Sequence, residues 1–217
     1  SREDVTLAGS ATFFHMAYLA AQRAAGEERI FPSLRACPGG GAPKPPALHT
    51  EIQQELGGQG ILSGWGLTEA PILTMASALD PDDKLATTEG RAMPGVLLRA
   101  VDLDGNEVGA GEEGELRAKA PQMMRGYLDG SLDADAFDAD GWFRTGDLGF
   151  IDEHGYVRIT GRVKDVIIRK GENVSAAEVE NLLYEHPKVA DVAVIGLPDA
   201  ERGEMVCAVV ATAEGAD

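Results

Sequence analysis

The order of strand and helix signals in the first 89 residues constrains the fold of this chain most strongly. Short apolar strands alternate with amphipathic helical stretches, in the order 5–8, 12–24, 34–37, 45–56 and 60–63. The apolar face of the first helix carries Phe13, Met16, Ala17 and Ala20, and that of the second carries Leu48, Ile52 and Leu56. A strand–helix–strand–helix–strand order predicts a parallel sheet with right-handed crossovers. We therefore expect residues 1–89 to form an α/β unit.

Glycine-rich loops follow two of these strands. Residues 38–43 hold three consecutive glycines between two prolines, which predicts an irregular loop, and residues 64–69 read Gly-Trp-Gly-Leu-Thr-Glu. Ligands of parallel sheets bind beyond the carboxyl ends of the strands, and both loops are expected there, next to each other. The alternatives are a plain tight turn for the glycines and a core position for Trp65. The pattern leaves a nucleotide site and these alternatives open.

The sequence changes character over residues 90–163, where helical periodicity stops. Strands are expected over 96–103, 114–118, 148–151 and 156–160. The last two flank Asp152-Glu153-His154-Gly155, which is typical of a hairpin turn because glycine can take a left-handed corner. We expect a small antiparallel, barrel-like β-subdomain. The aspartates at 133, 135, 138 and 140 lack the central glycine and terminal glutamate of a calcium loop, so they are expected in a solvated helix or loop.

Residues 164–217 are expected to form a partial α+β C-terminal domain. A strand over 166–168 precedes Ser175-Ala176-Ala177-Glu178. This is a capping box, in which the serine hydroxyl accepts a free backbone amide and the glutamate reaches back. Val179, Leu182 and Leu183 are expected on the inner face of the helix, and strands over 192–195 and 205–212 follow. The predicted fold class is thus a parallel α/β portion, a β-subdomain and a partial α+β domain.

Charge and cysteine content restrict the partners. The net charge of -17 over 217 residues argues against nucleic acid or an anionic membrane as a partner. Apolar runs are interrupted well short of a bilayer's thickness, so no integral membrane segment is expected. Cys37 and Cys207 suggest neither a disulfide framework nor a metal site, which fits a reducing cytoplasm. The oligomeric state is not predicted by the sequence.

Three successive motifs carry a resemblance to a known family. They are the 64–69 motif, then Phe143-Arg144-Thr145-Gly146-Asp147, then Gly161-Arg162-Val163-Lys164-Asp165 with Lys170-Gly171-Glu172. Together they resemble signatures of the adenylate-forming superfamily, which includes acyl-CoA synthetases, non-ribosomal peptide adenylation domains and firefly luciferase. The Lys-Gly-Glu-Asn-Val stretch and the triple-glycine loop are most similar to those of fatty-acid and other acyl-CoA ligases.

The resemblance implies a two-step reaction and assigns roles to the 64–69 loop. ATP and a small-molecule carboxylate give an acyl-adenylate and pyrophosphate, and coenzyme A then displaces AMP. Trp65, where a tyrosine is commoner, would stack on the adenine. Thr68 would donate a hydrogen bond to a phosphate oxygen, and Glu69 would hold Mg²⁺, a hard ion that prefers carboxylate and phosphate oxygens.

The resemblance also assigns roles elsewhere in the chain. Asp147 would accept both ribose hydroxyls, and Arg162 would reach the ribose and a phosphate. Lys164 would be the hinge about which the C-terminal domain turns between the two half-reactions. The remaining implied contacts are a pocket lining by Gly40, Gly41 and Ala42, closure of the adenine site by Ile159, and passage of the pantetheine arm at Gly171.

Two family parts are expected outside these 217 residues. The phosphate-binding loop should precede residue 1, and the lysine that polarises the adenylating carboxylate should follow residue 217. We therefore expect this chain to be part of a longer enzyme and to be inactive alone. The alternatives are an adenylation domain that loads a carrier protein and a non-catalytic nucleotide-binding module.

Overall fold

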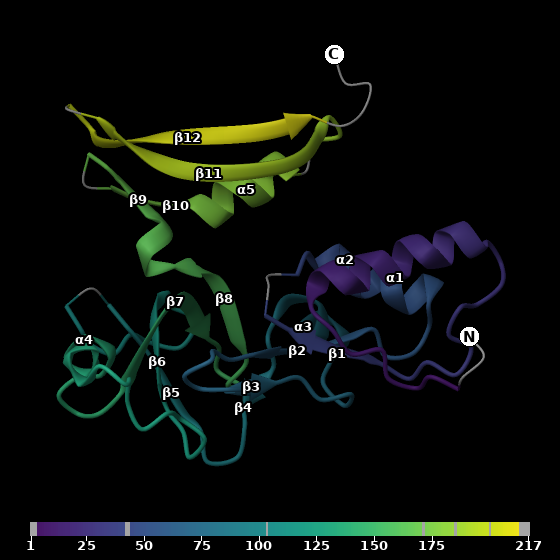
Figure 1. The fold of residues 1–217 in the computed structure, drawn as a ribbon, viewed down its shortest axis with the longest axis horizontal. Coiled ribbons are helices and arrows are strands. Elements are labelled where there is room, and N and C mark those ends of the chain that lie inside the picture. Colours follow the sequence, from purple (N-terminus) through teal and green to yellow (C-terminus); the bar gives the residue numbers. More distant parts are fainter. Residues whose placement is uncertain are drawn as a thin grey trace. The chain divides into compact units, whose positions relative to one another are not determined.

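The computed structural model describes residues 4–41, 44–102, 104–170, 172–184, 186–199 and 201–212. The chain divides into two compact units (Figure 1). The first comprises Ser1–Thr145 with Phe150–Ile159, and the second comprises Gly146–Gly149 with Thr160–Asp217. Among the described residues, no helix is long and apolar enough to cross a membrane.

The first unit begins with helices on a mixed sheet. The helices are α1 (Thr12–Ala25), α2 (Pro46–Glu55) and α3 (Asp82–Thr87), and the sheet order is β1 (Cys37–Gly40), β2 (Ile61–Trp65), β3 (Thr74–Met75) and β4 (Arg91–Ala92). Strands β1 and β2 run parallel, as predicted, but β3 and β4 are antiparallel additions. The strand expected over 5–8 makes only isolated parallel bridges, including one from Leu7 to Ala36.

The triple-glycine segment is more regular than its composition suggests. Strand β1 includes Pro38, Gly39 and Gly40, so the expected irregular loop is wrong for these residues. The cause is non-local, because each of them lies opposite a residue of β2 in parallel register. Glycine weakens a strand in isolation, but here it permits a close approach between neighbouring backbones.

The apolar face of α1 is exposed in this structure. Phe13 and Met16 are 73% and 53% exposed, while His15 and Gln22 are buried. Gln22 satisfies backbone groups of the following turn: its amide nitrogen donates to the carbonyl oxygens of Gly26 and Glu28, both at 3.1 Å. Helix α1 lies beside α2 (Figure 1), and both helices pack on a core of Leu19, Leu34, Cys37, Leu48, Ile52, Leu56 and Ile61.

The β-subdomain is an open sheet and not a barrel. Its order is β5 (Leu97–Val101), β6 (Gly114–Lys119), β7 (Phe143–Ile151) and β8 (Val157–Arg162), with β5 and β8 at the edges of the described sheet. Strands β5 and β6 pair antiparallel. The expected barrel-like closure is not seen in this described sheet, because its edge strands β5 and β8 do not pair with each other. A short helical segment, η1 (Gly130–Leu132) and α4 (Asp133–Ala136), lies between β6 and β7.

One aspartate of the acidic run is not solvated. The side chain of Asp138 is 9% exposed and accepts hydrogen bonds from Arg99 at 2.7 Å and from Arg117 at 2.9 Å. Arg99 also stacks on the Trp142 ring, 4.5 Å from its centroid. The expectation of a solvated run is therefore wrong for Asp138, because its cationic partners lie on β5 and β6, far from it in sequence.

The second unit is a four-stranded antiparallel sheet with one helix. After η2 (Val163–Asp165), the elements are β9 (Val166–Arg169), β10 (Glu172–Ser175), α5 (Ala176–Tyr184), β11 (Val189–Asp199) and β12 (Gly203–Thr212). The sheet order is β10-β9-β12-β11, and α5 packs on β11 (Figure 1). The Ser175 hydroxyl accepts a hydrogen bond from the Glu178 amide at 3.3 Å, which confirms the serine half of the predicted capping box. Leu182, expected inside, is 68% exposed.

Candidate functional site

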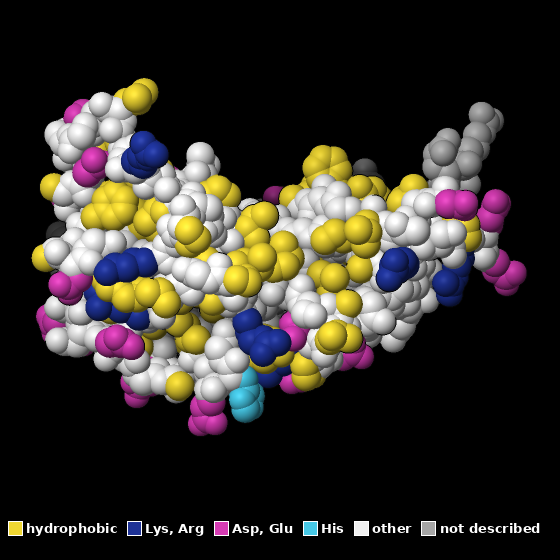
Figure 2. Space-filling model, turned by 90° about the horizontal axis from the view of Figure 1, so that it is seen from below, with side chains coloured by type: hydrophobic (Ala, Val, Ile, Leu, Met, Phe, Trp, Pro, Cys, Tyr) yellow, Lys and Arg dark blue, Asp and Glu magenta, His cyan; other side chains and the backbone are white. Residues whose placement is uncertain are grey.

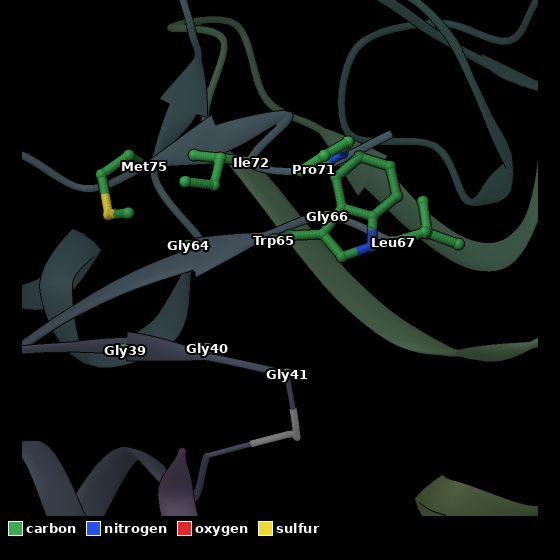
Figure 3. A pocket seen from close by; sticks show the side chains of 10 residues that line it. All are labelled: Gly39, Gly40, Gly41, Gly64, Trp65, Gly66, Leu67, Pro71, Ile72 and Met75. Carbon is green, nitrogen blue, oxygen red and sulfur yellow. The ribbon is translucent and has the colours of Figure 1, made fainter. Parts of the chain in front are cut away.

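A pocket of about 310 Å³ lies at the carboxyl ends of β1 and β2 (Figure 3). The ends of both strands, the turn that follows β2, and Met75 of β3 form its wall. The lining residues are Gly39, Gly40, Gly41, Gly64, Trp65, Gly66, Leu67, Pro71, Ile72 and Met75. The two loops that the sequence places at one sheet edge therefore do meet in the structure.

Two glycines of the pocket wall are required by close backbone approach. A Cβ at Gly40 would lie 2.0 Å from the Gly64 carbonyl oxygen of the neighbouring strand. A Cβ at Gly66 would lie 2.4 Å from the Ile72 nitrogen, across the turn. Both distances are far shorter than any real contact of a Cβ. Five of the ten lining residues are glycines, so part of the pocket wall is bare backbone, where a ligand can reach peptide groups directly.

Trp65 is both a pocket residue and a core residue. It is only 7% exposed and belongs to a cluster with Leu73, Val157 and other apolar side chains. Ile159, the other residue expected near the adenine, packs against the same cluster. The core position of Trp65 and its place in the pocket wall are thus compatible (Figure 3).

Strand β2 is fixed beside the pocket by a polar network. The Trp65 amide donates to Thr74 Oγ1 at 3.2 Å, and the Thr74 hydroxyl donates to the Glu89 carbonyl oxygen at 2.6 Å. Burial raises the pKa of the Glu89 carboxyl, while the charge of Lys44 and a hydrogen bond from Ser63 act in the opposite direction. The two hydrogen bonds of the Thr74 hydroxyl hold the backbone of the pocket wall in place.

The turn after β2 presents polar groups next to the pocket. Thr68 is exposed and Glu69 is half-buried. The Tyr127 hydroxyl donates to Glu69 Oε1 at 2.8 Å, and the Met124 amide donates to the Glu69 carbonyl oxygen at 2.8 Å. The hydrogen bond to Glu69 is the main cause of the raised pKa of Tyr127. Glu69 is therefore a fixed carboxylate beside a glycine-walled pocket.

The second unit holds a carboxylate–guanidinium pair of its own. Asp147 of β7 is 5% exposed, and its Oδ1 accepts from Arg162 Nε at 2.9 Å. The Arg162 side chain is about half exposed. Lys164 follows in η2, where it is exposed. A buried carboxylate next to an accessible cation suits a polyhydroxylated, anionic ligand.

The structure assigns the expected site residues to different units. Gly40, Gly41, Trp65, Thr68, Glu69 and Ile159 belong to the first unit, and Asp147, Arg162 and Lys164 belong to the second. Ala42 and Gly171 lie outside the described residues. Sequence reasoning missed Ile72 and Met75 in the pocket wall and Tyr127 beside Glu69. Tyr127 lies 58 residues from Glu69, and no local pattern indicates that contact.

The face shown in Figure 2 has no large basic region. Lys and Arg side chains form small separate groups on the face shown in Figure 2, among acidic and hydrophobic ones. Within the part of the chain that the structure describes, no three side chains of the His, Cys, Asp and Glu types cluster as a metal centre.

Comparison with known proteins identifies the family. Residues 1–128 match the AMP-binding enzyme family, and residues 178–217 match the AMP-binding enzyme C-terminal domain. The chain belongs to the AMP-binding, adenylate-forming enzyme family.

Individual relatives agree with this assignment. The 3-[(3aS,4S,7aS)-7a-methyl-1,5-dioxo-octahydro-1H-inden-4-yl]propanoyl:CoA ligase of Rhodococcus jostii is 42% identical over 184 residues, which are 84% of this chain and 34% of that protein. The medium-chain fatty-acid–CoA ligase of Escherichia coli is 40% identical over 79% of this chain and 30% of that protein. ATP-bound MatB from Rhodopseudomonas palustris superposes with a TM-score of 0.86 at 33% identity, over 98% of this chain and 42% of that one. The chain thus spans about a third of the length of the curated relatives it matches.

Proposed function

We propose that this chain contributes to an enzyme that activates a carboxylic acid with ATP and transfers the acyl group to coenzyme A. The observation that carries the proposal is the glycine-walled pocket with Trp65 in its wall and Thr68 and Glu69 in the turn that follows. A flat base can lie against the indole and the peptide groups of such a wall. The phosphates would then extend toward the polar turn.

The chemistry requires a good leaving group on the acyl carbon. A carboxylate is a poor acyl donor, because its leaving group would be oxide. In the first step the carboxylate oxygen would attack the α-phosphorus of ATP, and pyrophosphate would leave. In the second step the sulfur of coenzyme A would attack the acyl carbon, and AMP would leave with the oxygen that came from the acid. Electrostatic stabilisation of the phosphates is usually the largest single contribution to such catalysis.

The polar turn supplies groups that suit the phosphates. We assign to Thr68 a hydrogen bond to a phosphate oxygen and to Glu69 one ligand of Mg²⁺. Mg²⁺ retains water and is commonly held by one or two carboxylates together with substrate phosphates. A single half-buried carboxylate fits this requirement, and the ion would neutralise phosphate charge during the first step.

The second unit supplies groups that suit the ribose and the acceptor. We assign the ribose hydroxyls to Asp147, whose buried carboxylate can accept two hydrogen bonds. Arg162 would bind the ribose and a phosphate when the nucleotide replaces Asp147 as the partner of its guanidinium group. Lys164 would act as the hinge between the half-reactions, and Gly171 would border the pantetheine arm.

We expect the acid to be a fatty acid or a related compound. We propose that this pocket borders both the adenine and the acyl group. None of its lining residues carries a charge, which favours an acid with an apolar body over one with a second charged group. One of the relatives described above is by name a medium-chain fatty-acid–CoA ligase. We place the activity in the cytoplasm, which agrees with the cysteine content.

The test uses the protein expressed from the complete reading frame that contains this chain. It is incubated with ATP, Mg²⁺ and coenzyme A together with a panel of short, medium and aromatic acids, and nucleotide products are separated by chromatography. We expect AMP and pyrophosphate to form only when a suitable acid is present. Formation of ADP, or of AMP without any carboxylate, would show that the proposed reaction is wrong.

A further inference from the structure

The segment 122–127 binds the turn after β2 at three points. Gln122 Nε2 donates to the carbonyl oxygens of Pro71 and Ile72, at 3.1 and 3.0 Å. The Met124 amide donates to the Glu69 carbonyl oxygen at 2.8 Å. The Tyr127 hydroxyl donates to Glu69 Oε1 at 2.8 Å. Backbone and side chain of the same glutamate are thus held by one segment.

The turn that this segment holds is under backbone strain. Ile72 has a φ of +50°, a left-handed conformation that a β-branched residue rarely adopts. Residues in such sparsely populated conformations persist where surrounding contacts over-determine them. The two bonds from Gln122 fall on Ile72 and on the residue before it. The turn therefore depends on contacts from outside itself for its shape.

Tyr127 is itself anchored. Its amide donates to Asp133 Oδ1 at 2.9 Å, and Asp133 begins helix α4. The preceding residue, Gly126, has a φ of +150° and lies against the Asp133 carboxylate. A chain of contacts thus runs from α4 through Tyr127 to the carboxylate of Glu69, so the phenol is presented from a fixed backbone.

We propose that Tyr127 is a positioning residue for the cation that Glu69 binds, an inference that rests on the proposed role of Glu69. Its hydroxyl donates to Oε1 and would orient the Glu69 carboxylate that is proposed to hold the ion. Groups that hydrogen-bond a metal ligand from behind commonly change metal affinity about 10–100-fold when removed. Gln122 has a different role. It hydrogen-bonds the backbone of the pocket residues Pro71 and Ile72 and makes no contact with the Glu69 carboxylate.

The decisive variant is Tyr127→Phe in the protein from the complete reading frame. It keeps the ring and removes only the hydroxyl. We expect the Mg²⁺ concentration for half-maximal rate to rise about tenfold, with kcat at saturating Mg²⁺ near the unmodified value. As a readout independent of activity, binding of Mn²⁺ to the ATP-loaded protein, followed by electron paramagnetic resonance, should weaken by a similar factor.

Tyr184→Phe is the matched control. The Tyr184 hydroxyl also donates to a carboxylate, that of Asp191 in the second unit, so the same chemical change is made at a carboxylate with no proposed role in cation binding. Neither Mg²⁺ dependence nor Mn²⁺ binding should change in this variant. Gln122→Ala should raise the KM for the acid more than the Mg²⁺ requirement, because its bonds fall on pocket residues.

Glu69→Gln tests the proposed role of Glu69 separately from that of Tyr127. If Glu69→Gln weakens Mn²⁺ binding and Tyr127→Phe does not, the role of Tyr127 is overturned and the proposed role of Glu69 stands. If Glu69→Gln also binds Mn²⁺ as well as the unmodified protein, both roles are overturned. An unchanged thermal unfolding midpoint in each variant assigns any loss to the site and not to folding.

Discussion

At the scale of single residues, the Asp147–Arg162 pair is the clearest electrostatic feature of the second unit. The carboxylate is buried and its partner is half exposed, with 2.9 Å between Oδ1 and Nε. An accessible guanidinium can move aside or bridge to a ligand, while the buried carboxylate stays in place. We therefore propose that the pair binds a ribose next to a phosphate.

We expect Asp147→Asn to weaken nucleotide binding. Hydrogen bonds to a charged group contribute about 1.5–3 kcal/mol, so the loss should be at least about tenfold. Titration calorimetry of AMP with the protein from the complete reading frame measures it. Asp140→Asn, at an exposed aspartate of the acidic run, is the control and should bind normally. Equal affinities for all three proteins would exclude Asp147 from the site.

Asp138 gives a second prediction at this scale, about stability. Burial alone would raise the pKa of Asp138, but hydrogen bonds from the Trp142 amide, Arg117 and Arg99 outweigh it, so the pKa is lowered. Breaking a buried ion pair on one side costs about 3–5 kcal/mol, because a charge is left uncompensated. Asp138→Asn should therefore lower the unfolding midpoint markedly at neutral pH.

The pH dependence of that effect follows from the sign of the shift. A lowered pKa in the folded state means that the stabilisation is fully present above the unfolded pKa, about 3.9. It is lost as the pH falls through the folded pKa. The difference between the two proteins should be constant from pH 7 to about pH 5 and shrink below about pH 4. A difference that grew on acidification would contradict this account.

At the scale of elements, the sequence predicts helix bounds, a helix cap and the parallel pairing of β1 and β2, but not the features that depend on other distant contacts. The bounds of α1 and α2 and the Ser175 cap follow from apolar spacing and capping chemistry within a few residues. The regular strand at Gly39 and Gly40 requires β2, which begins more than 20 residues later. The exposed face of α1 and the burial of Asp138 likewise depend on segments that are distant in sequence.

Some residues of the candidate site can be predicted from the sequence, and others depend on the fold. Trp65, Thr68, Glu69, Asp147 and Arg162 lie in short motifs that the sequence displays directly. The pocket residues Ile72 and Met75 and the contact of Tyr127 depend on how the turn after β2 folds back. The positive φ of Ile72 cannot be read from its side chain, since isoleucine disfavours that conformation.

The prediction at the scale of elements concerns the short helix η2, which we propose as the hinge. Lys164 lies in η2, directly after β8 and before β9. Proline fixes φ near -65° and removes the amide donor, so Lys164→Pro should prevent the turn of the C-terminal domain that we propose between the half-reactions. We expect adenylate formation to survive while thioester formation falls by orders of magnitude. Single-turnover assays of each half-reaction measure both.

Lys164→Ala is the control for the charge at this position, because it removes the amine and keeps backbone freedom. It should leave both half-reactions largely intact. If the proline variant loses both half-reactions equally, or loses neither, Lys164 is not the hinge.

At the scale of the whole molecule, two compact units divide the implied functions. The first carries the glycine-walled pocket and the polar turn, and the second carries the Asp147–Arg162 pair and the hinge candidate. The chain spans about a third of its curated relatives, so we expect the 217 residues alone not to turn over. Phosphate-binding groups that we expect elsewhere would be needed to preorganise ATP.

Isotope labelling of the acid's carboxylate oxygens tests most directly whether the reaction passes through an acyl-adenylate. The protein from the complete reading frame is given an accepted acid labelled with ¹⁸O in its carboxylate, together with ATP, Mg²⁺ and coenzyme A, and the products are analysed by mass spectrometry. An acyl-adenylate pathway transfers one ¹⁸O from the acid to AMP for each thioester formed, and leaves pyrophosphate unlabelled. Label in inorganic phosphate or pyrophosphate, or AMP without label, would contradict the account.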